Sequence, residues 1–521
     1  MAAPDVDAPA AEIAAGYAFD GPALDLGALL WDGQCLPGVQ IRVPLSMLNR
    51  HGLVAGATGT GKTKTLQLLA EQLSANGVPV FLADVKGDVS GVSRPGTPDP
   101  NVDKRAAEVG QSWEPQDFPT EFYALGGLGP GIPVRATVTG FGPTLLAKVL
   151  GLNQTQEQSL GLVFHYADTK GLELVDLKDL RAVIAYLTSE QGKAELKEIG
   201  GISTATAGVL LRTLTAFEAQ GAAVFFGEPE FDTSEFLRTA ADGRGVMHVL
   251  ELPAVQDKPA LFSTFLMWLL ARLFQDLPEV GDVEQPKLVF FFDEAHLLFK
   301  DASKAFRESI VQTVRLIRSK GIGVFFVTQT PKDVPEDVLA QLGNRVQHAL
   351  RAHTPLDQRA LKAAVKTFPV SPYDLEEVLT TVGTGEAVVS VLGEKGAPTP
   401  VAVTRLRAPQ SLMDTVGDAA IDQAARESSL YARYAEAVDR ESAYEKLEAA
   451  ERAAQDEAER AEAEAAAQKA AEKAAREAKA AAPDGLVDQV VSSGIFRSIA
   501  RSMGTQIGRE ITRTLFGTRR R

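Results

Sequence analysis

The chain has 521 residues, of which 45% are hydrophobic and 23% charged, and its formal net charge is −15. It contains no apolar run of the roughly 20 residues that span a bilayer, and its acidic N-terminus lacks the regions of a signal peptide, so we expect a cytoplasmic protein. The single cysteine, Cys35, excludes an internal disulfide, and the net charge argues against a protein that coats nucleic acid with its whole surface.

The chain opens with a small strand-rich lead-in, which we place at residues 1–45 because short apolar pieces alternate there with Gly and Pro. A short strand over 49–55, a glycine-rich loop, a helix over 63–74 and a buried strand over 78–83 follow in that order. This order is the opening of a parallel α/β sheet, so residues 46–90 are predicted to form the first part of the core.

Residues 91–245 are predicted to form a mainly helical insertion, because loops rich in Gly and Pro are followed there by helical patterns. The core resumes over 246–410, where buried strands alternate with helices and restore a doubly wound pattern. The strands are expected at 245–252, 287–292 and 323–328, and the helices at 261–274 and 302–319.

Beyond residue 410 the composition changes sharply. Residues 411–482 are rich in Ala and Glu and predict a long helix, either solvated or paired along an Ala-lined coiled coil. Residues 483–521 predict a basic amphipathic segment, because 486–521 carry seven Arg against Asp488 and Glu510, with apolar residues at helical spacing. A segment of this kind is typical of binding to an anionic membrane surface. It is equally typical of packing against its own subunit or against a partner protein.

A complete phosphate-binding loop lies between the first core strand and the first core helix. Its glycines let successive backbone N–H groups point at a phosphate, Lys62 supplies a cation to the β- and γ-phosphates, and the Thr63 hydroxyl is a Mg²⁺ ligand. The predicted nucleotide-binding residues are Gly56, Ala57, Thr58, Gly59, Thr60, Gly61, Lys62, Thr63 and Thr65. The cofactors predicted are therefore ATP and Mg²⁺.

Two further buried strands end in polar residues. The apolar run 288–292 delivers Asp293, which we expect in the Mg²⁺ shell, and Glu294, which we expect to polarise the attacking water as general base. The strand over 323–328 ends in Gln329, whose amide is placed to contact both the γ-phosphate and the water. A Gln at a strand end is also common without a catalytic role. The support for a catalytic role of Gln329 therefore comes from the place of this strand in the order of motifs along the chain.

The order of these motifs resembles that of the HerA/FtsK superfamily of P-loop ATPases. It comprises the phosphate loop, Asp84-Val-Lys-Gly-Asp88, the Phe-rich strand with Asp293-Glu294, Arg-Ser-Lys-Gly at 318–321 and Val-Thr-Gln329. Residues from about 20 to 410 look most like the bacterial HerA-like family typified by YjgR. The resemblance implies a RecA-like P-loop core, with the helical insertion and the long C-terminal helix added to it.

The resemblance also implies a homo-oligomer, expected as a hexameric ring, in which a neighbour's arginine completes the site. Arg318 lies eleven residues before Gln329, the spacing at which coupling ATPases of this superfamily place that finger. Arg315, Arg345 and Arg351 are competing candidates. Any of these arginines could instead pair with a surface carboxylate.

Two function hypotheses remain open at this point. The first is an oligomeric ATPase that works on a polymer, with DNA as the polymer that the resemblance implies. The second is a nucleotide-dependent assembly scaffold or membrane-associated ATPase without DNA activity, which docks through residues 483–521. For Lys86 and Asp88 two roles remain open, namely catalytic positioning and stabilisation of the loop.

Overall fold

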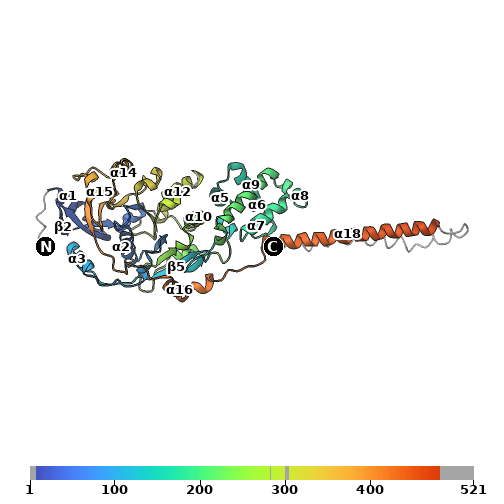
Figure 1. The fold of residues 1–521 in the computed structure, drawn as a ribbon, viewed down its shortest axis with the longest axis horizontal. Coiled ribbons are helices and arrows are strands. Elements are labelled where there is room, and N and C mark those ends of the chain that lie inside the picture. The colour runs from blue at the N-terminus through green and yellow to red at the C-terminus, as the bar shows by residue number, and fades with distance from the viewer. Residues whose placement is uncertain (1–7, 282, 300–303, 481–521) are drawn as a thin grey trace. The chain divides into compact units, whose positions relative to one another are not determined.

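The computed structural model describes residues 8–480 apart from 282 and 300–303, so the basic segment 483–521 lies outside the described residues. The chain divides into two compact units, Met1–Leu447 and Glu448–Arg521. A 12-stranded sheet runs through the first unit in the order β2-β1-β12-β11-β10-β3-β9-β8-β4-β7-β5-β6. Figure 1 shows the helices arranged around this sheet.

The strands from β10 to β6 in that order are parallel, and they carry the core. They are β3 (Gly52–Ala55), β4 (Val80–Asp84), β5 (Thr120–Leu125), β6 (Ile132–Val134), β7 (Met247–Glu251), β8 (Leu288–Phe292), β9 (Ile322–Thr328) and β10 (Asn344–Gln347). An antiparallel edge adds β1 (Ala23–Trp31), β2 (Gln34–Pro44), β11 (Glu386–Ser390) and β12 (Ala402–Leu406). The predicted α/β fold with a mostly parallel sheet is confirmed.

Side chains of each central strand alternate between two apolar layers. In β8, Phe290 and Phe292 face a layer that includes α10 and α12, whereas Val289 and Phe291 face the layer of α2. The helices of the core are α1 (Ala8–Gly16), α2 (Lys62–Ala75), α3 (Pro100–Val109), α10 (Pro259–Asp276), α11 (His296–Phe299), α12 (Lys304–Ile317), α13 (Glu336–Leu339), α14 (Pro355–Val365) and α15 (Leu375–Thr381). Burial on both faces explains why these strands are continuous apolar runs.

The segment 91–245 contributes both helices and strands. Figure 1 shows α5, α6, α7, α8 and α9 gathered in one cluster, whereas β5 and β6 extend the sheet beyond β7. The helices of this segment beyond α3 are α4 (Val138–Phe141), α5 (Pro143–Val149), α6 (Gln154–Lys170), α7 (Leu177–Thr188), α8 (Lys193–Glu198) and α9 (Thr204–Ala219). The lead-in likewise joins the sheet, because β1 pairs with β12.

After β12 the chain returns along α2, the helix that follows the phosphate loop. Glu71 of α2 is buried and accepts hydrogen bonds from the backbone N–H groups of Gln410 (2.8 Å) and Ser411 (3.0 Å). The Gln67 amide donates to the Leu412 carbonyl at 2.9 Å. Helices α16 (Asp418–Glu427), α17 (Tyr431–Tyr434) and α18 (Ala443–Ala480) follow. The long C-terminal helix is therefore confirmed.

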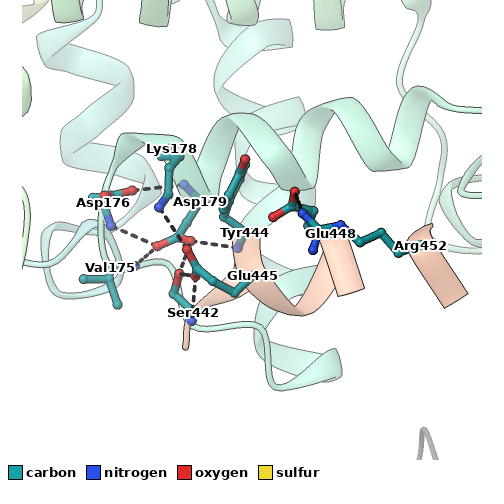
Figure 2. Close-up of polar contacts among 9 residues, drawn as sticks. All are labelled: Val175, Asp176, Lys178, Asp179, Ser442, Tyr444, Glu445, Glu448 and Arg452. Carbon is teal, nitrogen blue, oxygen red and sulfur yellow. Dashed lines mark hydrogen bonds and ion pairs between the residues drawn. The ribbon is translucent and has the colours of Figure 1, made fainter. Parts of the chain in front are cut away.

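The first turn of α18 is fixed to α7 by one buried carboxylate, that of Asp179 (Figure 2). One Asp179 oxygen accepts the N–H groups of Val175 and Asp176 at the start of α7. The other accepts the Ser442 hydroxyl and the Tyr444 N–H at the start of α18. A single side chain thus satisfies free N–H groups at two helix ends.

Among the described helices, none combines the length and the apolar character that crossing a bilayer demands.

Replacing Asp179 with Ala should lower the free energy of unfolding by about 2 to 4 kcal/mol, because four donors at two helix ends lose their acceptor at once. Urea denaturation of the full chain measures this change. Ser442→Ala removes only the hydroxyl contact at α18 and should cost about 1 kcal/mol. Equal losses for the two variants would contradict the double-cap role of Asp179.

Candidate nucleotide site

The phosphate loop is held from both sides by the strands that flank β3. The Gly56 N–H donates to the Thr328 carbonyl at the end of β9 (3.2 Å), and the Ala57 N–H donates to the Ala349 carbonyl just beyond β10 (2.8 Å). A Cβ atom on Gly56 would lie 2.4 Å from Cβ of His348, so only glycine fits there. The loop is therefore braced by its two neighbours in the sheet.

Within the loop, polar side chains turn back onto the backbone. Thr60 Oγ1 donates to the Ala57 carbonyl at 2.7 Å, and Lys62 Nζ donates to the same carbonyl at 3.1 Å. Gly59 and Gly61 have φ angles of 81° and 110°, which favour glycine. Thr58 and Gly59 are exposed. The loop is therefore open to solvent, and the Lys62 ammonium already lies against its backbone.

His348, the residue that follows β10, lies beneath the loop. Its Nε2 is 2.8 Å from the hydroxyl of Thr65, which is itself buried and donates to the Gly61 carbonyl at 3.2 Å. Burial, together with the charge of Lys62, lowers the pKa of His348 to about 4, so the ring is neutral at physiological pH. Thr65, predicted as a nucleotide contact, thus has its hydroxyl engaged within the protein.

Asp293 and Glu294 follow β8 beside the loop, as the sequence predicts. Both are buried, and Asp293 Oδ2 has no hydrogen-bond partner. Burial, with the added charge of Glu294, raises the pKa of Asp293 to about 7 despite the nearby Lys86. Glu294 adopts a φ of 48°, an unfavourable angle for a residue with a side chain, and such strain is concentrated at functional sites.

Glu294 is in contact with Lys86 and His296. Its Oε1 forms an ion pair with Lys86, and its Oε2 lies 3.1 Å from His296 Nδ1. Burial alone would raise its pKa, but the hydrogen bond from Lys86 and the charges of Lys86, His296 and Lys62 outweigh it and hold the pKa below its ordinary value. The carboxylate is therefore ionised.

Asp88 belongs to this cluster, although the sequence left its role open. Its Oδ2 accepts a hydrogen bond from the Thr63 hydroxyl at 3.3 Å, and its buried Oδ1 has no hydrogen-bond partner. The unpartnered oxygen atoms of Asp88 and Asp293, with the Thr63 hydroxyl that contacts Asp88, are the hard ligands that Mg²⁺ prefers, so the donor set fits this ion. In the described part of the chain, no group of three or more His, Cys, Asp and Glu side chains forms a complete metal site by itself.

Gln329 and Arg318 lie at opposite ends of β9. Gln329 is exposed and lines a hollow of about 270 Å³ with Ala57, Thr58 and Arg351. Arg318 precedes the strand in a short 3₁₀ turn, Arg318–Lys320. At roughly 3.3 Å per residue, the seven residues of β9 separate the two by about 20 Å. The structure therefore brings Gln329 to the loop of its own chain but not Arg318.

Over residues 32–521 the chain matches the protein family described as Helicase HerA-like C-terminal. The chain belongs to the HerA-like helicase family. This membership confirms the resemblance to the HerA/FtsK superfamily, and with the fold it makes the core that of a P-loop NTPase.

Two curated relatives illustrate this relationship. The DNA double-strand break repair helicase HerA of Sulfurisphaera tokodaii is 22% identical over 359 residues, which cover 67% of this chain and 64% of that protein. The probable helicase MJECL08 of Methanocaldococcus jannaschii is 29% identical over 153 residues, 27% of this chain and 28% of that protein. This chain therefore spans less than two thirds of the length of these relatives.

Among solved structures, the bacterial conjugative coupling protein TrwBdeltaN70 in complex with sulphate has a TM-score of 0.51 at 14% identity, covering 78% of this chain and 95% of that one. Plasmid coupling protein TrwB in complex with ADP and Mg²⁺ has a TM-score of 0.50 at 15% identity, covering 77% and 98%. At such identities the likeness concerns the fold, and it confirms the RecA-like arrangement.

Asp88→Asn should weaken the Mg²⁺-dependent part of ADP binding by about tenfold, because the amide is neutral and a poorer Mg²⁺ ligand. Titrations of a fluorescent ADP with Mg²⁺ and with EDTA measure this. Binding in EDTA should be unchanged, since Asp88 lies beside Thr63 and not within the glycine loop. Equal weakening under both conditions would indicate a role in the fold of the loop instead.

Proposed function

We propose that this chain is a Mg²⁺-dependent ATPase that works as a homo-oligomer of HerA/FtsK type and moves along DNA. The observation that carries the proposal is the cluster beside the loop, in which Lys62 after β3 and Asp293 and Glu294 after β8 converge from the ends of two parallel strands. Because nucleotides bind at the carboxyl ends of such strands, this cluster faces the phosphates.

In this proposal each side chain has a distinct role. The backbone N–H groups of the loop hold the β-phosphate, and Lys62 turns from the Ala57 carbonyl to the β- and γ-phosphates. Thr63, Asp293 and Asp88 would hold Mg²⁺, which neutralises phosphate charge when bound. Asp293 would then be deprotonated, because a cation favours the charged carboxylate.

The attacking water is oriented by groups on two strands. Glu294 accepts its proton as general base, and Gln329 positions it from the end of β9. A neighbouring subunit in a ring, expected to be hexameric, supplies the positive charge that the transition state requires. Arg318 is our proposed finger because it lies far from the site of its own chain.

DNA as the polymer rests on the relatives. Two matching relatives are named as DNA double-strand break repair helicases, and another is named as a probable helicase. A cytoplasmic location remains a prediction, as does docking of residues 483–521 on an anionic membrane or a partner protein.

Stimulation of ATP hydrolysis by double-stranded DNA tests the polymer. We expect a several-fold increase over the basal rate, and a Glu294→Gln control should bind ATP but lose about 10² to 10⁴-fold in turnover with or without DNA. A wild-type rate that does not respond to double- or single-stranded DNA excludes the motor. Stimulation by anionic liposomes, lost on deleting 486–521, would favour the scaffold instead.

Mixing inactive subunits tests the shared site. Arg318→Ala subunits keep a complete site but lack the finger, whereas Glu294→Gln subunits keep the finger but lack the base. Mixed oligomers should therefore hydrolyse ATP measurably faster than either variant alone, because some interfaces combine both intact groups. Arg315→Ala, at the exposed competing candidate on α12, is tested in the same way, and complementation by that variant in place of Arg318→Ala would assign the finger to Arg315. If Arg318→Ala shows no loss of activity, the finger assignment is wrong.

A further inference from the structure

Lys86 lies on a turn that is fixed in place by buried Asp84. The Asp84 carboxylate, at the end of β4, accepts the backbone N–H groups of Gly87 (2.7 Å), Asp88 (3.2 Å) and Val89 (2.8 Å). The Lys86 side chain is nevertheless 41% exposed. The backbone of the turn is thus held firmly, while the lysine side chain remains free to change its partner.

The present partner of Lys86 is the proposed general base. The ammonium pairs with Glu294 Oε1, whose side chain is only 5% exposed, while His296 engages Oε2. A base held in an ion pair with a lysine ammonium is a weaker acceptor for a water proton. Efficient hydrolysis therefore requires Lys86 to move away from Glu294.

A second ammonium group lies nearby. Burial lowers the pKa of Lys62, and the nearby charge of Lys86 lowers it further. Glu294, Asp293 and Asp88 offset that repulsion. Two lysines that approach one site from different strands provide a favourable position for an anion with more than one negative charge.

We propose that Lys86 is a catalytic residue that leaves Glu294 for the γ-phosphate of a bound nucleoside triphosphate. The exchange does two things at once. It places a second cation of the same subunit on the phosphoryl group, where charge develops during hydrolysis, and it releases the Glu294 carboxylate to accept a proton from water. A nucleoside diphosphate lacks the γ-phosphate and leaves the pair closed. This inference rests on the proposed ATPase function.

Binding of a non-hydrolysable ATP analogue and of ADP, both with Mg²⁺, tests the exchange in the full chain. Lys86→Met should weaken the ATP analogue by about tenfold and ADP by less than about twofold, because a charge-assisted hydrogen bond to the γ-phosphate is lost. Lys86→Arg should restore most of the preference for the triphosphate. Lys287→Met is the matched control, since Lys287 is exposed and precedes the first residue of β8, at the end of the strand opposite to Glu294.

The outcomes separate a failure of the ATPase proposal from a failure of the role proposed for Lys86. If wild-type protein binds neither nucleotide, the ATPase proposal itself fails. If wild type prefers the ATP analogue and folded Lys86→Met, with an unchanged melting temperature, prefers it equally, the role of Lys86 is wrong. An equal loss of both nucleotides in Lys86→Met also overturns it, because a γ-phosphate contact cannot affect ADP.

A double-mutant cycle gives a second readout. Glu294→Gln removes the competing carboxylate charge, so Lys86 should then hold the γ-phosphate more tightly, and affinity for the ATP analogue should rise several-fold with little change for ADP. The rise should disappear in Lys86→Met/Glu294→Gln. A similar rise in that double variant would show that Glu294 acts without Lys86 and would contradict the exchange.

Discussion

The parallel alignment of β9, β3 and β10 is the constraint on which the site depends. Their carboxyl ends meet at one edge of the sheet. There the Gly56 N–H donates to the Thr328 carbonyl at the end of β9, and the Ala57 N–H donates to the Ala349 carbonyl just beyond β10. The loop shape is therefore imposed by hydrogen bonds to its neighbours as well as by its glycines. Because β8 pairs with β9, Asp293 and Glu294 are delivered to the same edge. The position of the acids thus follows from the register that braces the loop.

Charge balance is the second organising feature of this edge. Two lysines and three carboxylates are brought close together, and each would be costly to bury alone. Together they remain stable, but the balance is sensitive to any added charge, as the raised pKa of Asp293 and the lowered pKa of Glu294 illustrate. A phosphate or a divalent cation would change both of these pKa values. The same electrostatic coupling that stabilises the cluster therefore makes it responsive to a ligand.

Two other buried carboxylates connect distant parts of the chain. Glu71 ties residues 410 and 411 to the helix that follows the phosphate loop, and Asp179 ties the start of α18 to the insertion. In both cases a carboxylate accepts backbone N–H groups that would otherwise lack a partner inside the protein. The segment between β12 and α18 is thus anchored at both ends, once at the nucleotide-proximal helix and once at the helical cluster.

The sequence by itself determined the phosphate loop, the acid pair after a phenylalanine-rich strand and the long terminal helix, because each depends on a local pattern of apolar, glycine or alanine residues. It did not reveal β10, whose Asn-Arg-Val-Gln residues form no apolar run and whose Asn344 is satisfied by the Met47 and His51 carbonyl groups. Only the tertiary structure decided that Asp88 meets Thr63, that Lys86 meets Glu294 and that Arg318 lies away from the loop of its own chain. The Lys86–Glu294 pair arises because β4 and β8, which are far apart in sequence, are neighbours in the sheet, and spacing along the chain carries no record of that pairing.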